Sequence, residues 1–318
     1  MTPPLRIALT MGDPAGIGPE LAAKAVAAAS LWAGAEPVLY GDPLILRQAL
    51  ARFAPGTTVP IVDTGAVGEA FEVGQAAAAC GRAALAAVRC ATLDALAGRV
   101  DAMVTSPMNK AAVNLAGITF TGHTEFIAEL CGVPEVVMMQ SAGKLHVAFV
   151  TTHVALAQVP ALISVERIVR VTRLLREALL EEGVETPLLA MAALNPHAGE
   201  DGWMGDEDER VTKKAIAGLR SEKIAVEGPF PPDTLFIPGT LERFDGVISM
   251  YHDQGHIPFK MIAFDRGVNS TLGLPVIRTS PDHGTAFGIA GRGVADTGSF
   301  FAAVELAIRK ARTRRAKR

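Results

Sequence analysis

The segment LRIALTMGDPAGIGPE, residues 5–20, has the pattern of a strand, a glycine-rich turn and the start of a helix. Leu5–Thr10 is mostly apolar without strict alternation, which is typical of a strand buried on both faces of a parallel sheet. The turn begins at Gly12, and Pro19 suits the first position of the helix that follows. This turn lacks both the Gly-x-Gly-x-x-Gly spacing of the dinucleotide fingerprint and the Gly-Lys-Ser/Thr of a P-loop. It therefore predicts a β/α unit without a Rossmann fingerprint.

The same alternation continues along the chain. Strands are predicted at Pro37–Tyr40, Val59–Val62, Ala102–Thr105, His146–Thr151, Leu188–Leu194 and Val247–Met250. Helices are predicted at Gln75–Leu96, Val165–Glu182 and Glu207–Leu219. Ser164 is a good N-cap for the second helix, and Gly183 is a good stop signal. This order of elements predicts an α/β fold with a mainly parallel sheet.

Length and composition fit a globular enzyme. The chain has 318 residues, which suggests two domains, and 49% hydrophobic with 20% charged residues is too apolar for a disordered chain. The net charge of −3 gives no sign of nucleic acid binding. Cys80, Cys90 and Cys131 are odd in number and widely spaced, which favours a reduced, cytoplasmic protein. We see no signal peptide and no apolar run of membrane-spanning length, so we expect no membrane partner.

The last ten residues, RKARTRRAKR, hold seven of the thirty Lys and Arg residues. Basic tails can bind anionic surfaces. We favour a frayed, solubilising end of the last helix.

Three histidines share one context. His153 follows the run HVAFVTT, His197 follows LLAMAALNP and His252 follows GVISMY, so each lies just past the carboxyl end of a predicted strand. Ligands bind at that edge in open parallel sheets, and three imidazoles can hold a divalent cation there. The alternative is three loop histidines with local hydrogen bonds, and their long separations match no local metal motif.

His252 and His256 are four residues apart, like the paired ligands of a zinc-protease helix. Gly255 and Pro258 argue against a helix here, and the glutamate of that motif is missing. We therefore expect His256 either to face the substrate or to have a structural role.

Candidate anion-binding residues are dispersed. In TFTGHTEFIAEL, His123 and Thr124 lie where a helix begins, which suits a phosphate, although a simple N-cap explains the pattern equally well. Lys260, Asn269 and Arg278 could bind phosphate or carboxylate groups, or could be solvated surface residues. The glycine-rich stretch PDHGTAFGIAGRGVAD, residues 281–296, predicts a loop around an extended ligand or an Ω-loop.

Taken together, these segments strongly resemble the 4-hydroxythreonine-4-phosphate dehydrogenase (PdxA) family. The resemblance covers nearly the whole chain and rests on GDPAGIGPE, TSPMNKAAVNLAG, FTGHTEF, LNPHAGE, GPFPPDTLF, YHDQGH, GVNSTLGLPVIRTS and DHGTAFGIAGRGVAD. It implies a two-domain α/β/α fold like that of isocitrate and isopropylmalate dehydrogenases. We expect residues 1–107 and 256–318 to form a cofactor-side domain. Residues 108–255 would form the metal, substrate and dimerisation domain, with the active site in the cleft between the two.

The resemblance also implies roles for individual residues. It makes His153, His197 and His252 the ligands of one divalent ion (Zn, Mg or Co) shared between the subunits of a homodimer. It makes His123, Thr124, Lys260, Asn269 and Arg278 substrate-binding residues. NAD or NADP would be bound by the glycine-rich loop, at Asp282, His283, Gly284, Thr285, Ala286 and Gly291. Asp253 and Lys260 are the candidate general bases, being the titratable groups nearest in sequence.

The implied reaction is oxidation and decarboxylation of a 4-phosphorylated hydroxy acid. With 4-phosphohydroxythreonine the product is 3-amino-2-oxopropyl phosphate, a precursor in pyridoxal phosphate biosynthesis. One departure is Gly255-His256-Ile257-Pro258, where the biosynthetic branch usually has Leu-Pro after the glycine. That variant is similar to a branch acting on D-threonate or D-erythronate 4-phosphate, which would give dihydroxyacetone phosphate. Two other classes stay open, namely a non-redox metal-dependent hydrolase or aldolase, and a phosphate-ligand sensor without catalysis.

Overall fold

The computed structural model describes residues 3–317, and its contacts divide the chain into two compact units. Unit 1 is formed by Met1–Val136 and Leu274–Arg318, and unit 2 by Val137–Gly273. The chain therefore passes from unit 1 into unit 2 after Val136 and returns to unit 1 after Gly273. The sequence had led us to expect these two boundaries after residues 107 and 255. The segment that carries His123 consequently belongs to unit 1, and the segment that carries Lys260 and Asn269 belongs to unit 2.

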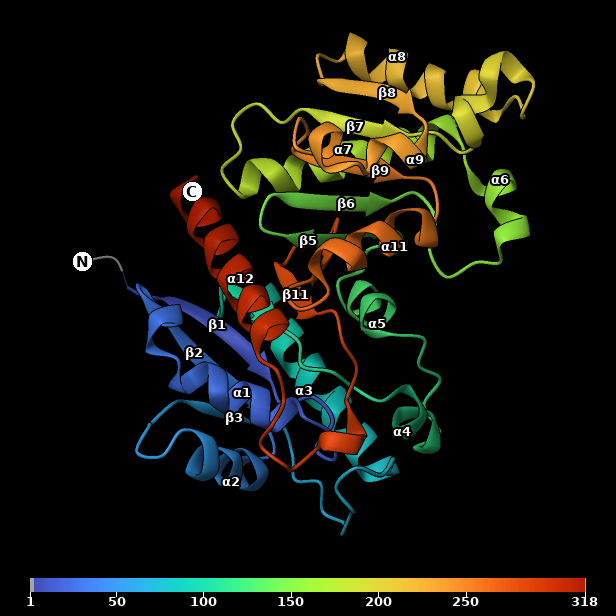
Figure 1. Cartoon of the computed structure of the whole chain (residues 1–318). Coiled ribbons are helices and arrows are strands. Elements are labelled where there is room, and N and C mark those ends of the chain that lie inside the picture. Colours follow the sequence, from blue (N-terminus) through green and yellow to red (C-terminus); the bar gives the residue numbers. More distant parts are fainter. Residues whose placement is uncertain (1–2, 318) are drawn as a thin grey trace. The chain divides into compact units, whose positions relative to one another are not determined.

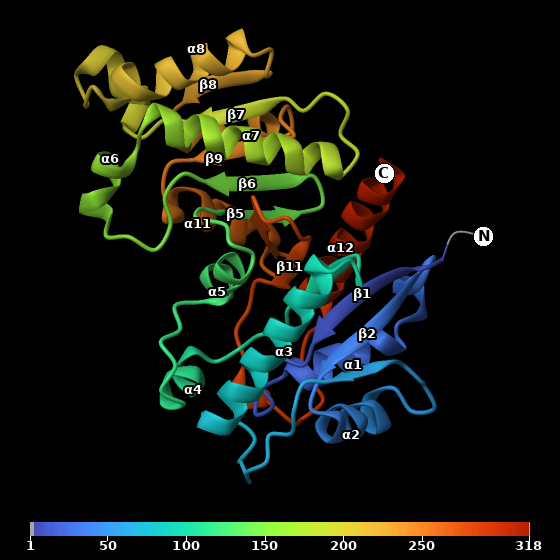
Figure 2. The same ribbon diagram turned by 180° about the vertical axis from the view of Figure 1, so that it is seen from behind.

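Unit 1 is built on a parallel sheet in the order β3-β2-β1-β4-β11. Helices α1 and α12 pack on one face of this sheet, and α3 packs on the other (Figures 1 and 2). The strands are β1 (Leu5–Thr10), β2 (Ala35–Gly41), β3 (Ile61–Asp63), β4 (Ala102–Val104) and β11 (Arg278–Pro281). The helices are α1 (Gly18–Ala27), η1 (Ala29–Trp32), α2 (Pro43–Phe53), α3 (Ala78–Leu96), α4 (Lys110–Leu115), α5 (His123–Leu130), η5 (Phe287–Ile289) and α12 (Gly298–Ala316).

The expectation of a frayed basic tail is wrong for the described residues. α12 continues to Ala316, and three arginines of its last turns donate hydrogen bonds to backbone carbonyls of unit 1. Arg312 binds the carbonyl of Ala33, Arg314 that of Pro275, and Arg315 that of Pro3. These side chains stabilise the helix end because they satisfy carbonyls that a frayed tail would leave to water.

Unit 2 has the strand order β10-β5-β6-β9-β7-β8, in which only β5 runs antiparallel to its neighbours. Its strands are β5 (Val137–Ala142), β6 (Leu145–Phe149), β7 (Leu189–Ala192), β8 (Val226–Phe230), β9 (Gly246–Ser249) and β10 (Val268–Leu272). Its helical elements are η2 (Leu156–Gln158), α6 (Val159–Leu162), α7 (Val165–Glu181), η3 (Pro196–Gly202), the π-helical turn η4 (Asp208–Thr212), α8 (Lys213–Ser221), α9 (Pro232–Leu235), α10 (Pro238–Leu241) and α11 (His252–Ala263).

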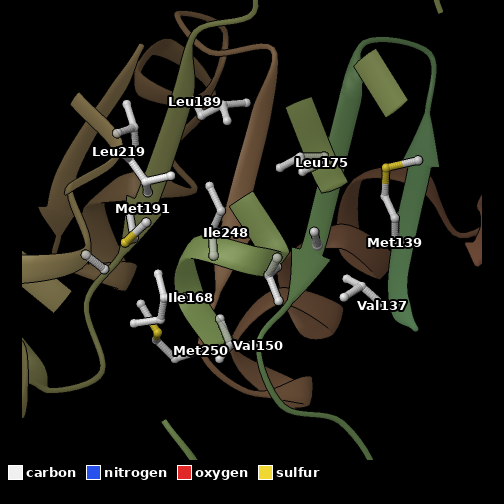
Figure 3. Close-up of a cluster of buried hydrophobic side chains, with 14 of the residues drawn as sticks. Val137, Met139, Val150, Ile168, Leu175, Leu189, Met191, Leu219, Ile248 and Met250 are labelled. Carbon is white, nitrogen blue, oxygen red and sulfur yellow. The ribbon is translucent and has the colours of Figure 1, made fainter. Parts of the chain in front are cut away.

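One buried cluster of unit 2 packs the helices α7 and α8 against the sheet (Figure 3), and a second cluster includes residues of α11. The Ser164 hydroxyl accepts a hydrogen bond from Arg167 N at 3.2 Å, which confirms the predicted N-cap. Ile168 and Leu175 are fully buried on the inner face of the helix and pack with strand residues such as Ile248. Each such side chain contributes about 1.5–3 kcal/mol by leaving water. These buried apolar side chains, one to two helical turns apart, anchor the helix on the sheet.

The prediction that no helix follows His252 is wrong, since α11 spans His252–Ala263 with Pro258 inside it. Gly255 is required for packing, because a Cβ at this position would lie 2.8 Å from atoms of Phe149 and Val147. Gln254 fixes the start of the helix by accepting from Met250 N at 2.7 Å and donating to the Ala193 carbonyl at 2.7 Å.

The mainly parallel α/β architecture is confirmed, and each predicted strand is present with its ends shifted by no more than a few residues. The predicted helix at Glu207–Leu219 is divided into η4 and α8. Among residues 3–317, no helix is long and apolar enough to cross a bilayer.

Candidate functional site

His123 is the centre of a positively charged site in unit 1. It is the first residue of α5, and its ring Nε2 is enclosed without a hydrogen-bond partner. Burial, together with the nearby cations Arg278 and Lys110, lowers the pKa of His123 to about 3. The ring is therefore neutral at physiological pH, and the enclosed nitrogen has no group of this unit to bind. Thr124 follows it in the first turn of the helix.

Arg278 lies beside this histidine at the start of β11, with 5% of its surface exposed. Its Nε and Nη2 both donate to the Thr105 hydroxyl, at 3.1 and 2.7 Å. Burial lowers the pKa of Arg278 to about 10, an effect that the Glu125 carboxylate opposes. A buried guanidinium is costly unless an anion balances it, so this group favours a negatively charged ligand.

Sequence reasoning missed two further groups here. Lys110 begins α4, and its Nζ lies 3.8 Å from the position that a Cβ of Gly122 would take. The Ser106 hydroxyl is fully buried and has no hydrogen-bond partner in the described structure. Both residues belong to the segment TSPMNK after β4, whose polar residues at a strand end were the available signal.

The two glycine-rich segments of unit 1 meet. Ile17 N donates to the Thr285 carbonyl at 3.1 Å, and a Cβ on Gly16 would lie 3.0 Å from Thr285. Residues 281–296 form a loop with one short 3₁₀ turn, as expected, in which Ala286 has a left-handed φ of 45°. The loop is tied to α12, since Asp282 N donates to the Ser299 hydroxyl at 3.0 Å.

Two polar atoms in these segments lack partners. His283 Nε2 and Asp13 Oδ2 are both enclosed without a hydrogen bond. Burial raises the pKa of Asp13 against the effect of two backbone N–H groups. Enclosed, unpaired polar atoms of this kind fit a ligand with its own donors and acceptors, as a dinucleotide has. Gly284 and Gly291 lie in the same loop, and no Cβ on Gly284 would meet another atom within 4 Å.

In unit 2 the three histidines do follow neighbouring strands. β6, β9 and β7 are adjacent and parallel, and His153, His252 and His197 come after them in turn. The ring centres of His153 and His252 are 5.8 Å apart. Two imidazoles on one ion at metal–nitrogen distances of about 2.1 Å have ring centres about 5–6 Å apart. These two rings therefore fit a shared divalent cation.

His252 is oriented by its neighbour. Its Nδ1 lies 2.7 Å from Asp253 Oδ1, which leaves Nε2 as the nitrogen for a metal. His153, His252 and Asp253 line a recess of about 440 Å³ together with Thr151, Thr152, Val154, Leu156, Val159 and Tyr251.

His197 is not brought to this pair. Within the described part of a single chain, no three His, Cys, Asp or Glu side chains are arranged to hold a metal ion. His197 instead lies in a left-handed stretch, where residues 197–201 all have φ between 42° and 82°. Left-handed backbone costs about 1–2 kcal/mol for each residue with a Cβ, so other contacts must stabilise this segment.

The other predicted residues of unit 2 are dispersed. Lys260 is two turns beyond His252 in α11, with its Nζ 5.6 Å from the ring centre of Phe264. Asn269 lies in β10, and its Oδ1 is enclosed without a hydrogen-bond partner. Asp253 is largely exposed at 70%.

His256 packs against His252 with ring centres 4.1 Å apart, one helical turn further along α11. It is buried, and its Nε2 lies 3.4 Å from the side-chain nitrogen of the fully buried Gln140. Gln140 was not noted in the sequence, because a lone glutamine in an apolar strand carries no distinctive pattern.

Residues 33–307 match the model of the family described as pyridoxal phosphate biosynthetic protein PdxA. The chain belongs to the PdxA family. It is 43% identical to a 4-hydroxythreonine-4-phosphate dehydrogenase of Desulfosudis oleivorans, over 98% of this chain and 97% of that protein. It is 42% identical to a D-threonate 4-phosphate dehydrogenase of Salmonella typhimurium, over 96% and 98%.

The crystal structure of a 4-hydroxythreonine-4-phosphate dehydrogenase from Klebsiella pneumoniae is similar throughout, with a TM-score of 0.85 and 39% identity over 98% of each chain. The family resemblance seen in the sequence is thus confirmed, and so is the fold expected for a PdxA protein.

Proposed function

We propose that this PdxA protein is a metal-requiring, NAD(P)-dependent dehydrogenase that oxidises a 4-phosphorylated hydroxy acid and releases its carboxylate as CO₂. The names of its relatives support an oxidoreductase acting on a small phosphorylated acid. The first candidate substrate is 4-phosphohydroxythreonine, with 3-amino-2-oxopropyl phosphate as product.

The enclosed, unpartnered Nε2 of His123 is the observation that carries the substrate class. It lies near the cationic side chains of Arg278 and Lys110. A phosphate dianion would balance both charges, and it would favour the protonated ring, which could then donate a charge-assisted hydrogen bond.

His153 and His252 would hold the divalent ion, with Asp253 orienting the His252 ring. The ion supplies positive charge for the oxygen atoms of the substrate, and the nicotinamide supplies the hydride acceptor. Asp253 and Lys260 are the candidate bases for the hydroxyl proton.

The glycine-rich loop at residues 281–296 would hold NAD or NADP. The Thr285 carbonyl of this loop accepts a hydrogen bond from Ile17 N, so the loop contacts the glycine-rich turn that begins at Gly12. Each of these two segments carries an enclosed polar atom without a hydrogen-bond partner, Asp13 Oδ2 in the turn and His283 Nε2 in the loop, which supports this assignment. The cofactor residues expected there are Asp282, His283, Gly284, Thr285, Ala286 and Gly291.

We also propose a homodimer in which His197 of a second copy completes the metal site. Trp203 is 90% exposed six residues beyond His197, and Met204 beside it is exposed as well. Met261 in α11 and Phe264 directly after this helix are 83% and 78% exposed. Exposed apolar side chains that follow two of the candidate ligands in the sequence support association through unit 2.

A second candidate substrate is D-threonate or D-erythronate 4-phosphate. The buried His256 beside His252 favours it. An imidazole can bond the C2 hydroxyl of a sugar acid, whereas its cationic form would repel the C2 ammonium of 4-phosphohydroxythreonine.

A substrate panel tests these proposals. The three phosphorylated acids and their dephosphorylated forms are each assayed with NAD⁺ and NADP⁺ by absorbance of the reduced nicotinamide, with and without a chelator. We expect turnover only with a phosphorylated acid, a nicotinamide and a divalent ion. Equal activity on a dephosphorylated acid would exclude the phosphate site, and turnover without nicotinamide would favour a hydrolase or aldolase.

A further inference from the structure

The Asp208 carboxylate accepts hydrogen bonds from the backbone just before the left-handed segment that carries His197. Asp208 is fully buried in unit 2. Its Oδ1 accepts from Leu194 N at 2.9 Å and from the Thr212 hydroxyl at 3.0 Å, and its Oδ2 accepts from Asn195 N at 2.9 Å. The two backbone donors come just before Pro196 and His197, so the carboxylate fixes the backbone from which the left-handed stretch departs.

The residues that follow the left-handed stretch fold back towards its start. Met204 N donates to the Gly199 carbonyl at 3.1 Å, and a Cβ on Gly199 would lie 2.8 Å from the Gly205 carbonyl oxygen. The Asn195 side chain donates to Glu207 at 2.8 Å, next to Asp208. The segment is therefore a closed loop whose two ends meet at the start of η4.

The π-helical turn η4 gives a reason for this arrangement. Asp208 and Thr212 are its first and last residues, and their side chains bond to each other. Single π-helical turns within α-helices occur frequently at functional sites. Here the turn precedes α8 directly and presents the carboxylate to the loop.

We propose that Asp208 is a positioning residue for metal binding, which acts through His197 and touches neither metal nor substrate. This inference rests on the proposed function, because His197 is a metal ligand only there. Three donors converge on the carboxylate, and an asparagine could not accept from all of them, since its NH₂ group would face at least one N–H or O–H. Removing the carboxylate would release the backbone before His197 and lower the metal affinity.

The test compares four variants as purified full-length protein. Asp208→Asn replaces one of the two acceptor oxygens by a donor NH₂ group, and His197→Ala removes the ligand itself. Asp206→Asn is the matched control, because Asp206 is 67% exposed and pairs with Arg210 on the surface. Thr212→Val removes one of the three bonds and keeps the carboxylate. Zn²⁺ affinity is measured directly by competition with a chromophoric chelator, together with the melting temperature of the metal-free protein.

We expect Asp208→Asn to weaken Zn²⁺ binding about 10- to 100-fold, as losses of groups that orient metal ligands do. Asp206→Asn should stay within about twofold of the parent by the same measure. Thr212→Val should weaken binding by a smaller factor, and it keeps the proposal testable if Asp208→Asn does not fold. A purely structural role would lower the melting temperature without changing the Zn²⁺ affinity of the folded protein.

The His197→Ala variant distinguishes failure of the positioning role of Asp208 from failure of the metal site itself. If His197→Ala weakens Zn²⁺ binding while Asp208→Asn and Thr212→Val bind like the parent, the positioning proposal is overturned and the metal site stands. If His197→Ala also binds Zn²⁺ like the parent, the metal assignment fails and the proposal fails with it.

Discussion

Lowering the pH from 8 to 5 should destabilise unit 1 through His123. In the unfolded chain this ring takes up its proton near pH 6.5, whereas in the folded unit burial and two cations lower its pKa to about 3. At pH 5 the unfolded state therefore binds a proton that the folded state does not. Stability is present above pH 6.5 and is lost as the pH falls towards 3. Linkage gives a loss of about 2 kcal/mol between pH 8 and 5 from this group alone.

Urea unfolding at the two pH values measures this loss. Trp32 lies in unit 1 and donates to the Ala25 carbonyl at 2.8 Å, so its fluorescence reports on this unit in a Trp203→Phe background. The same protein with His123→Gln cannot titrate at this position, and all other groups cancel in the comparison. The parent should lose about 2 kcal/mol more than the variant. Equal losses, or an NMR titration of His123 with a midpoint above pH 6, would refute the proposed environment of the ring.

Three further changes test other parts of the structure. His256→Leu should change the ratio of kcat/KM between D-erythronate 4-phosphate and 4-phosphohydroxythreonine by more than about twofold, or about 0.4 kcal/mol; a smaller change would leave His256 a purely packing role. Glu182→Gln replaces the carboxylate whose Oε2 lies within hydrogen-bond distance, 3.1 Å, of the buried His146 ring, and should destabilise unit 2 by about 1–3 kcal/mol in urea unfolding, whereas a loss below about 0.5 kcal/mol would contradict a stabilising hydrogen bond. Gly255→Ala should cost about 1–3 kcal/mol by overpacking against Phe149, while Gly218→Ala, a helical control with no atom within 4 Å of the new Cβ, should be neutral or stabilising by up to about 1 kcal/mol; similar results for both would show that Gly255 has room.

Elements with a strong local pattern could be predicted from the sequence. The helix α7 combines a Ser164 cap, an apolar stripe and a glycine stop, and its predicted and observed bounds differ by one residue. The strands β10 and β11 were missed because VNSTL and RTSP place polar residues at buried positions, where apolar runs were sought. The helix α11 was missed because Gly255 and Pro258 are breakers by propensity, whereas here the glycine satisfies close packing against β6.

Part of the candidate site could also be predicted, because its histidines follow a pattern that is visible in the sequence. Strand-end histidines could be placed on one edge because parallel strands end together, and His153 and His252 are indeed close. The contribution of Asp208 could not be foreseen, since a carboxylate that accepts from backbone groups thirteen and fourteen residues away has no local signature. The left-handed stretch is equally hidden, because only one of its five residues is a glycine.

The division of unit 1 into two chain segments bears on how the protein is made. A ribosome delivers all of Val137–Gly273 before β11 and α12 exist. Until then β4 lacks its parallel partner β11, and the face of the sheet that α12 covers is exposed. Unit 2 is contiguous and can fold during translation. Unit 1 cannot complete its sheet until β11 is synthesised, and an unpaired strand edge is prone to wrong pairing and aggregation. Arg278 arrives with that late segment, so the proposed anion site can form only after unit 2 has been synthesised.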